Sequence, residues 1–346
     1  MKKTLITGIN GQDGSYLAEF LLSKNYEVHG TLKRNSVSEN QTSRLEGIYD
    51  KITLHYADLS DLSSLVSVIQ KVMPNEIYNL AAQSHVRISF DQPIYTANVT
   101  GIGTLNLLEA VKLIKPDTKV YQASSSEMFG NSIDRDGLQR ETTQMNPVSP
   151  YGCAKVFSYH ICRNYRNSYG MKIWNGILFN HESPRRGGTF VTKKVVDALV
   201  DLKFNDSEHL RIGNLEAKRD WGYAKEYVEG MWLMLQQTTP EDFVLATGEV
   251  HTVRELVEVT SKRLGYDIVW DGTLENEKGY DSNTGKLLVE VDSKYFRPSE
   301  VDYLLGDPKK AKEKLNWKPS TNFEKLIEIM IDEKVSELKK HKITTH

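Results

Sequence analysis

Apolar residues in the first half of the chain follow two alternating patterns. Short runs rich in β-branched residues predict strands, and longer stretches with apolar residues every three or four positions predict helices. The strand runs are Lys3–Thr7, Glu27–Leu32, Ile52–Tyr56, Glu76–Leu80, Lys119–Ala123 and Lys172–Leu178. The helical stretches lie near Ser15–Ser23, Leu62–Val72, Tyr95–Ile114 and Pro150–Ser168. This alternation predicts an α/β fold with a doubly wound parallel sheet, whose ligands bind beyond the carboxyl ends of the strands.

The second half mixes strands and helices without strict alternation. Its expected strands are Leu210–Gly213 and Phe243–Thr247. Helices are expected at Ala224–Gln236, Val253–Leu264 and Phe323–Lys339, with a polar segment at Asp271–Lys286. Because no repeat or low-complexity linker divides the chain, we expect two non-contiguous domains. The larger comprises residues 1–180 with 218–250, and a smaller mixed α/β domain comprises 181–217 with 251–346.

Composition and charge narrow the class of protein. Of the 346 residues, 26% are charged and 39% hydrophobic, and the formal net charge is −2, as in ordinary soluble globular proteins. No basic field is predicted that would attract nucleic acid or an anionic membrane. The chain shows no signal-peptide pattern and no apolar run long enough to span a bilayer. Cys153 and Cys162 supply neither a disulfide framework nor a metal-ligand cluster, so we expect a cytoplasmic protein without a metal.

The first predicted strand runs into the glycine-rich loop Thr7-Gly8-Ile9-Asn10-Gly11-Gln12-Asp13-Gly14. Glycine lets a backbone turn sharply and approach a pyrophosphate, and the following helix directs N–H groups at that anion. Such a loop can also be a bare turn, but its place between a strand and a helix favours dinucleotide binding in a Rossmann-type domain. The candidate cofactor ligands are Gly8, Asn10, Gly11, Gln12, Asp13 and Gly14.

Other strand ends carry further candidates. Lys33 and Arg34 suit a 2′-phosphate and favour NADP over NAD, unless they are ordinary solvated charges. Asp58, before Leu59, either accepts from an adenine amino group or, with Ser60, caps a helix. Small residues after the fourth strand would let a ribose or nicotinamide lie against the backbone, or simply pack closely. These are the residues of Leu80-Ala81-Ala82-Gln83-Ser84-His85.

Tyr151 and Lys155 are four residues apart, on one face of a predicted helix. Because a nearby ammonium lowers the pKa of a phenol, the pair is a candidate general base with a cationic partner. Lys155 is also placed to hold a nicotinamide ribose. In isolation the pair could equally be a surface contact. The dinucleotide loop favours the catalytic interpretation.

Hydroxyls and a carboxylate follow the fifth strand, in Ser124-Ser125-Ser126-Glu127. At this edge of the sheet Ser125 could donate to a substrate oxygen while Tyr151 removes its proton. Glu127 is either an acid–base group or a carboxylate at a helix N-terminus.

These motifs resemble the extended short-chain dehydrogenase/reductase family, in which an acid at Glu127 is typical of nucleotide-sugar 4,6-dehydratases. Longer stretches resemble the GDP-mannose 4,6-dehydratase family: Gly11–Leu22, Tyr78–Val86, Gly176–Gly187, Arg219–Gly222, Arg297–Asp302 and Leu305–Pro308. The resemblance covers nearly the whole chain. It implies an NADP-dependent lyase that removes water from a GDP-sugar, with NADP in the larger domain and the GDP-sugar in the smaller one.

The resemblance also implies roles for residues. Tyr151 is similar to the base at O4, Lys155 to its partner and Glu127 to the acid–base at C5 and C6, with Ser125 beside them. Arg34, Tyr95, His181 and Arg186 look like cofactor contacts, besides Asp58, Leu59, Leu80, Ala81, Ala82 and Gln83. Ser84, Asn180, Lys194, Arg219, Arg297 and Glu300 look like substrate contacts. Arginine suits a diphosphate, although Lys194, Arg219 and Arg297 could also be solvated charges.

Two features depart from the family pattern. The loop Asn131–Arg140 is longer and more charged than usual. Ser125 stands where the family usually has threonine, and the missing methyl favours GDP-D-glycero-α-D-manno-heptose over the alternative, GDP-α-D-mannose.

Three rival functions stay open: a nucleotide-sugar epimerase, a reductase, and a catalytically silent NADP(H)-binding protein. The resemblance further implies a homotetramer in which the loop Asn35–Ile48 reaches a neighbouring subunit, with Arg44 as a candidate contact.

Overall fold

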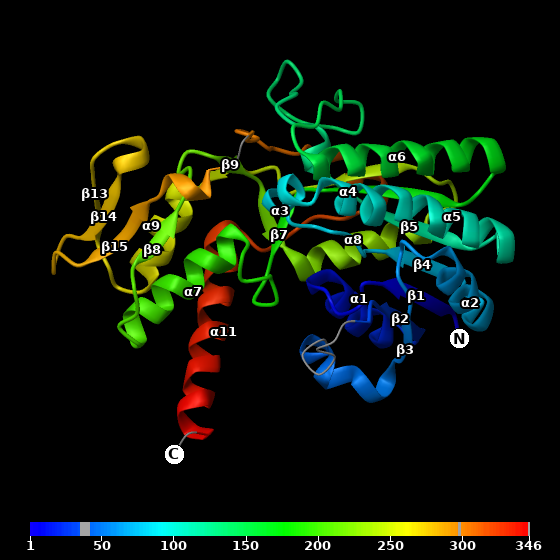
Figure 1. The fold of residues 1–346 in the computed structure, drawn as a ribbon, viewed down its shortest axis with the longest axis horizontal. Helices are drawn as coiled ribbons and strands as arrows, with labels where there is room; N and C mark the ends of the chain where they lie inside the picture. The colour runs from blue at the N-terminus through cyan, green and yellow to red at the C-terminus, as the bar shows by residue number, and fades with distance from the viewer. Residues whose placement is uncertain (35–41, 297–298, 345–346) are drawn as a thin grey trace.

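The larger body of the molecule is built on a seven-stranded parallel sheet (Figure 1). The computed structural model describes residues 1–34, 42–296 and 299–344, with side chains as far as residue 340. The strand order is β3-β2-β1-β4-β5-β6-β11. The strands are β1 (Lys3–Thr7), β2 (Glu27–Leu32), β3 (Thr53–Tyr56), β4 (Glu76–Asn79), β5 (Lys119–Ser125), β6 (Ile173–Leu178) and β11 (Asp242–Leu245). Each lies within two residues of its predicted place.

Helices cover both faces of this sheet. One apolar cluster joins the sheet to α1 (Gln12–Ser23) and α8 (Ala224–Gln236), through buried residues such as Leu17 and Met231. A second cluster joins it to α2 (Leu62–Val72), α5 (Gly103–Ile114) and α6 (Pro150–Tyr169). The predicted doubly wound α/β fold is therefore confirmed. The order of strands reverses direction at β1 and β4, and such a switch point is where these sheets bind ligands.

The helix predicted at Tyr95–Ile114 is interrupted. In the structure α3 (Val86–Asp91) and α4 (Pro93–Thr96) lead into a π-helical turn, η3 (Ala97–Ile102), before α5 begins. Gly101 faces α6, and a Cβ at Gly103 would lie only 2.7 Å from the Leu59 Cβ. Tertiary packing thus overrides the helical period here. Turns of this π type are rare and occur often at functional sites.

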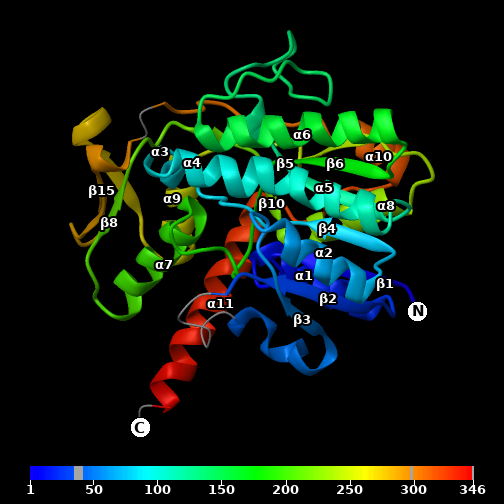
Figure 2. The ribbon, with the colours of Figure 1, turned by 45° about the vertical axis from the view of Figure 1, so that its right-hand side comes forward.

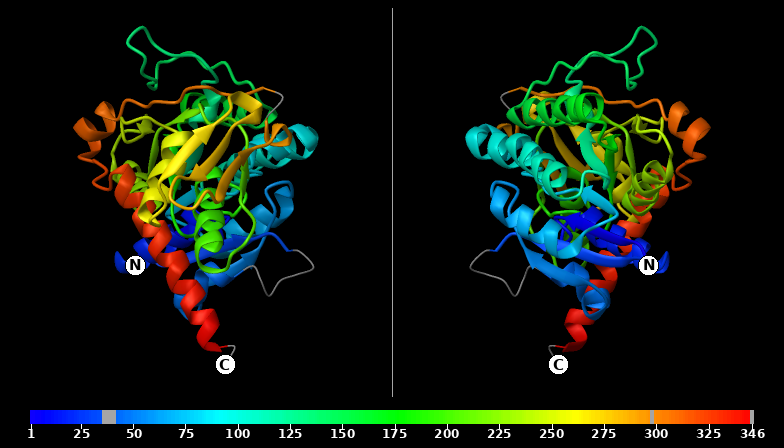
Figure 3. Two further views of the ribbon diagram at one scale, coloured as in Figure 1. Left: turned by 90° about the vertical axis from the view of Figure 1, so that its left-hand side faces the viewer. Right: turned by 90° about the vertical axis from the view of Figure 1, so that its right-hand side faces the viewer.

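The smaller body carries a mixed four-stranded sheet in the order β13-β14-β15-β8. Its strands are β8 (Leu210–Ile212), β13 (Ile268–Asp271), β14 (Lys278–Asp281) and β15 (Leu287–Val291). Three helices cover it: α7 (Val191–Phe204), α9 (Val253–Arg263) and α11 (Phe323–Thr344), whose end projects from the molecule (Figure 3). The segment expected to be merely polar contains β14, and α7 and β15 were not predicted. None of the described helices combines the length and apolar character needed to cross a membrane.

Short strand pairs and turns lie between the two bodies. β7 (Asn180–Glu182) pairs in parallel with β10 (Trp221–Tyr223), and β9 (Lys218–Arg219) pairs antiparallel with β12 (His251–Thr252). Elsewhere in the molecule lie the 3₁₀ elements η2 (Ser43–Lys51), η4 (Ser126–Met128), η5 (Leu274–Asn276) and η6 (Ser293–Tyr295), and the short α-helix α10 (Lys309–Leu315). Residues 311–317 pack into the core of the larger body, although the predicted domain division placed them in the smaller one.

Side chains cover the edge of the main sheet that β11 forms. Glu141 accepts a hydrogen bond from the backbone N–H of Val244 in β11 at 2.8 Å, and Lys310 donates to the Asp242 carbonyl at 2.7 Å. Glu141 follows the charged loop 131–140, which rises above α6 (Figure 2). Arg140 fixes this loop through Asp134, Asp136 and Asp307.

Candidate active site

The glycine-rich loop lies between β1 and α1, as predicted. Gly8 has a φ of +67°, which favours glycine, and a Cβ at Gly14 would lie 2.4 Å from the Gly8 carbonyl oxygen. The Thr7 hydroxyl accepts from the N–H groups of Leu80 and Ala81, so the ends of β1 and β4 are held together. Within the part of the chain that the structure describes, no side chain caps the N-terminus of α1. The loop therefore combines a tight turn with helix N–H groups that suit an anion.

A cavity of about 280 Å³, called the small cavity below, opens beside this loop. Lys33 Nζ lies 3.1 Å from the Asp58 carboxylate and 3.1 Å from the Tyr95 hydroxyl, so these three side chains form one side. The helix-capping alternative for Asp58 is wrong, because Asp61 caps α2. The cavity is lined by Gly8, Asn10, Gly11, Thr31, Lys33, Ala57, Asp58, Leu59, Leu80, Ala81, Ala82, Ser84, Tyr95 and Val99.

Two predicted arginine contacts lie outside the lining of the small cavity. The Arg34 guanidinium lies 5.7 Å from the ring centre of Tyr56. Arg44 donates to the carbonyl of Asn10 in its own chain at 3.2 Å. Its contact with a neighbouring subunit stays a prediction, and residues 35–41 of that loop lie outside the described residues.

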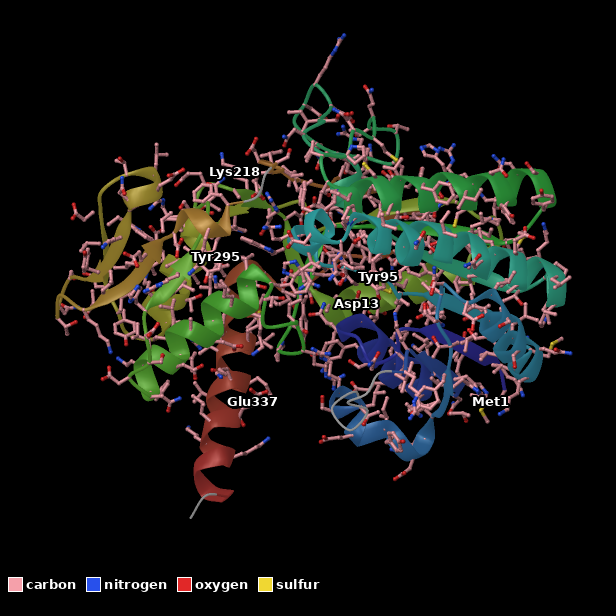
Figure 4. The ribbon with its side chains drawn as sticks, viewed as in Figure 1. Met1, Asp13, Tyr95, Lys218, Tyr295 and Glu337 are labelled. Atoms are coloured by element: carbon pink, nitrogen blue, oxygen red, sulfur yellow. The ribbon has the colours of Figure 1, made fainter. Side chains whose placement is uncertain are left out.

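A second cavity of about 340 Å³, called the large cavity below, lies between the two bodies and shares Leu80, Ala82 and Ser84 with the small one. It brings together all four predicted catalytic residues: Ser125, Glu127, Tyr151 and Lys155. It also contains Asp13 from the glycine loop and Tyr295 from the smaller body, both labelled in Figure 4. Residues far apart in the sequence therefore meet in one site.

Tyr151 and Lys155 are both buried at the start of α6. Burial raises the pKa of Tyr151 to about 12, although a hydrogen bond with Ser125 opposes this. Burial also lowers the pKa of Lys155 to about 8. The Lys155 ammonium donates to the Ala123 carbonyl at 2.6 Å and lies 5.7 Å from the Tyr151 ring centre. The expected lowering of the phenol pKa is therefore wrong for this structure, because lost hydration outweighs the hydrogen bond with Ser125 and the charge of Arg186, which lower it.

Glu127 follows β5 in the single turn η4, and its buried side chain lines the large cavity. Its N–H donates to the Ser125 hydroxyl at 3.2 Å. Its charge is one of the influences that raise the pKa of Tyr151, so the two groups act on each other. The carboxylate therefore faces the site as well as standing at a helix start.

A buried ion pair joins the glycine loop to β7. His181 Nε2 lies 2.8 Å from the Asp13 carboxylate, and its Nδ1 donates to the Phe179 carbonyl at 2.7 Å. Burial opposes both charges, but the mutual attraction raises the pKa of His181 and lowers that of Asp13. The Gln12 amide is also engaged, with the His181 carbonyl and the Ser183 hydroxyl. The side chains of Gln12 and Asp13 thus anchor the glycine loop to residues 181–183.

The later segments of the chain bring positively charged side chains to the large cavity. The buried Arg219 pairs with Glu300 at 3.0 Å. Lys194 lies 3.5 Å from the ring centre of Tyr295, and burial, helped by the nearby Lys294, lowers its pKa to about 8. Because Lys194 and Arg219 line the large cavity, they are not simply solvated charges. Arg297 lies outside the described residues.

Asn180 and Arg186 also line the large cavity. The buried side-chain oxygen of Asn180 has no hydrogen-bond partner among the described residues. Arg186 pairs with Glu182 at 3.0 Å and lies 3.7 Å from the ring centre of Phe190. Sequence reasoning missed Phe190 and Tyr295, because isolated aromatic residues in loops have no spacing that marks them.

The Rossmann-like sheet, its glycine loop and the buried Tyr–Lys pair beside it define an extended short-chain dehydrogenase/reductase. A family model described as GDP-mannose 4,6 dehydratase matches residues 5–330, so the chain belongs to that family. The human GDP-mannose 4,6 dehydratase is 54% identical over 337 residues, which cover 94% of this chain and 90% of that protein. The enzyme of Yersinia enterocolitica is 49% identical over an alignment of 360 residues, covering 99% and 96%.

Solved structures show the same fold at lower identity. The dTDP-glucose 4,6-dehydratase of Bacillus anthracis, in complex with NAD, has a TM-score of 0.78 and 20% identity, covering 96% of both chains. The RMD protein of Pseudomonas aeruginosa, complexed with NADPH, has a TM-score of 0.76 and 18% identity, covering 97% of this chain and all of that one.

Proposed function

We propose that this protein is a 4,6-dehydratase that converts a GDP-manno sugar to its GDP-4-keto-6-deoxy product with loss of water. The single observation that carries this proposal is that Glu127 lines the same cavity as Ser125, Tyr151 and Lys155. A simple dehydrogenase or epimerase needs only the Ser–Tyr–Lys set. A second acid–base group in that cavity is what elimination of water requires.

The small cavity fits the adenosine part of NADP, and its junction with the large cavity fits the nicotinamide. Gly8 and Gly14 leave no room for side chains where a pyrophosphate would approach the backbone. Lys33 and Arg34 are the cations available to a 2′-phosphate. Bound NADP⁺ would supply the hydride acceptor and donor for the sugar, and its positive ring would favour the Tyr151 phenolate.

Tyr151 acts at O4 of the sugar. Its phenolate takes the O4 proton as C4 is oxidised, while Ser125 donates a hydrogen bond to the same oxygen. Lys155, held by the Ala123 carbonyl, supplies positive charge beside the cofactor ribose. Burial raises the pKa of Tyr151, so positive charge that enters the site with the cofactor would favour the phenolate.

Glu127 acts at C5 and C6. Once C4 is a ketone, the C5 hydrogen is acidic, and Glu127 removes it. The same group then gives a proton to the C6 hydroxyl, which leaves as water. Bound cofactor would return the hydride to C6. The proton that Tyr151 took from O4 balances the proton added to C5, so neither the protein nor the cofactor would be changed overall. The net change is loss of one water from the sugar.

The GDP part is proposed to bind at Lys194 and Arg219, whose charges suit a diphosphate. Glu300, which pairs with Arg219, and Asn180, whose side-chain oxygen finds no partner among the residues described, suit sugar hydroxyls. The relatives named for GDP-mannose support that substrate for this chain. The absence of a methyl at Ser125 supports GDP-D-glycero-α-D-manno-heptose as a second candidate.

Mass spectrometry of the products made by purified protein tests the function. Incubation with NADP⁺ and each GDP-sugar should yield a product lighter by one water. Tight NADPH binding without any such product would instead favour a silent binding protein. A kcat/KM for GDP-mannose at least about tenfold above that for the heptose would exclude the heptose as the preferred substrate.

Glu127→Gln tests the acid–base assignment. We expect loss of both the 4-keto product and deuterium incorporation at C5 from heavy water. Glu141→Gln is the matched control, because Glu141 is a partly buried carboxylate outside the large cavity. Undiminished C5 exchange in Glu127→Gln would contradict the role. The homotetramer and the cytoplasmic location stay predictions, for which gel filtration and cell fractionation are the measurements.

A further inference from the structure

The π-helical turn η3 contacts both the cofactor-side segment 80–85 and the helix that carries Tyr151 and Lys155. Thr100 stands in this turn with 2% of its surface exposed. Its hydroxyl accepts a hydrogen bond from the Gln83 N–H at 3.2 Å. Its carbonyl accepts one from the Ser158 hydroxyl of α6 at 2.8 Å. One buried residue thus touches two functional elements with two different groups.

Ser158 lies on the same face of α6 as Tyr151 and Lys155. Tyr151, Lys155 and Ser158 are spaced i, i+4 and i+7, so they share one side of the helix. The Ser158 hydroxyl is fully buried and lies outside both cavities. Besides Thr100, it contacts the Ala154 carbonyl at 2.9 Å and accepts from the Thr104 hydroxyl at 3.2 Å. A shift of η3 would therefore move the turn of α6 that carries Lys155 and Ser158.

The other side of Thr100 leads to the wall shared by the two cavities. Gln83 lies between Ala82 and Ser84, which line both. Its side chain accepts from the His85 N–H at 2.6 Å and donates to the Thr96 hydroxyl at 3.1 Å. The loop is thus pinned to α4 and η3 by its own polar groups. Gln83 itself lies in neither lining, and its predicted contact with the cofactor stays a prediction.

We propose that Thr100 is a positioning residue that fixes the cofactor-side segment 80–85 relative to the catalytic helix α6. The extra residue of a π turn changes the helical register and aims the Thr100 carbonyl at a neighbouring helix while its hydroxyl faces the loop. The role extends the proposed function, since it sets how the nicotinamide-side wall faces Tyr151 and Lys155. Thr100 itself lines neither cavity.

Four full-length proteins test this role: wild type, Thr100→Val, Ser158→Ala and the control Thr118→Val. Valine keeps the shape of threonine and removes its hydroxyl. Thr118 matches Thr100 in burial, and its hydroxyl bonds the Pro74 carbonyl, away from both cavities. NADPH binding is measured by fluorescence titration, and backbone opening of the protein without cofactor by hydrogen–deuterium exchange.

In Thr100→Val the Gln83 N–H loses its partner, so we expect the NADPH Kd to rise about tenfold and exchange at Gln83 to accelerate. Ser158→Ala should lower kcat about threefold and raise the NADPH Kd about threefold, although Ser158 lines neither cavity. Thr118→Val should leave the NADPH Kd, kcat and the exchange at Gln83 unchanged. A Thr100→Val protein with wild-type exchange at Gln83 and a wild-type Kd would overturn the role. Failure of the wild type to bind NADPH would overturn the proposed cofactor, while the exchange experiment still tests the contact with Gln83.

Discussion

The small cavity and the large cavity share one wall but are built in different ways. The small cavity is lined mainly by backbone and short side chains at the carboxyl ends of β1 to β4, with Lys33, Asp58 and Tyr95 at one side. The large cavity combines small residues at the ends of the strands with long polar and aromatic side chains, which come from segments between Asp13 and Glu300. The first depends on a backbone shape, and the second on the docking of the two bodies.

This difference predicts how each site fails. A substitution that disturbs the glycine loop should affect cofactor binding and folding together, because one backbone serves both. A substitution in the large cavity should remove a chemical step or a charge and leave the fold intact. The predictions below separate these two kinds of failure.

The largest effect is expected for Tyr151→Phe. The phenol is the proposed proton acceptor at O4, so kcat should fall about 10³-fold, while the NADPH Kd stays within about threefold. Product formation and fluorescence titration measure the two. Tyr159→Phe is the control on the same helix, since its buried hydroxyl bonds Asp242 outside the cavity. Equal losses in both variants would mean that the helix, not the phenol, is responsible.

Gly14→Ala tests the backbone site. The new Cβ would lie 2.4 Å from the Gly8 oxygen and 2.7 Å from the Ile9 Cα, so the loop must move. We expect about 1–3 kcal/mol of lost stability in urea unfolding, together with weaker NADPH binding. Gly47→Ala has no atom within 4 Å and should behave as wild type. Normal NADPH binding by Gly14→Ala would show that the small cavity does not depend on the backbone shape of the glycine loop.

The pH dependence of substrate binding tests Lys194. Its pKa is lowered to about 8, so the ammonium is charged below that pH and loses its charge above it. The KM for the GDP-sugar should therefore rise about three- to tenfold between pH 7 and 9 as attraction to the diphosphate is lost. In Lys194→Arg the charge persists, and the rise should disappear. The same rise in both proteins would assign it to another group.

Arg34→Ala gives the smallest expected effect. If Arg34 turns from Tyr56 towards a 2′-phosphate, the NADPH Kd should rise about fivefold while that of NADH is unchanged. The two cofactors are compared by titration of the same preparation. An equal change for both would show that Arg34 does not choose between them.

Sequence reasoning was strongest where the site is local. The parallel strands, the glycine loop and the Tyr151–Lys155 spacing follow from repeating patterns or fixed separations, and the structure has all three. Asp61 as the cap of α2 was missed, because neighbouring Asp and Ser residues offer equivalent caps.

Sequence reasoning was weakest where contacts between distant segments determine the local structure or the pKa of a group. The π turn at Thr100 depends on packing against Leu59 and α6, and no period in the sequence marks it. The raised pKa of Tyr151 depends on burial, which the spacing to Lys155 does not reveal. The ring of Tyr295 meets Lys194 across about a hundred residues of sequence, and no local pattern marks that contact.

The covered edge of the main sheet limits how copies of this protein can associate. An open edge strand is a template for another chain, which can extend the sheet and start aggregation. At β11 the Val244 N–H is already occupied by Glu141, and the Asp242 carbonyl by Lys310. Strand addition there would first have to displace both side chains and expose the partly buried Glu141. Any ordered assembly that spares these contacts therefore uses helices or loops as its contact surface on this side, not a continuous sheet.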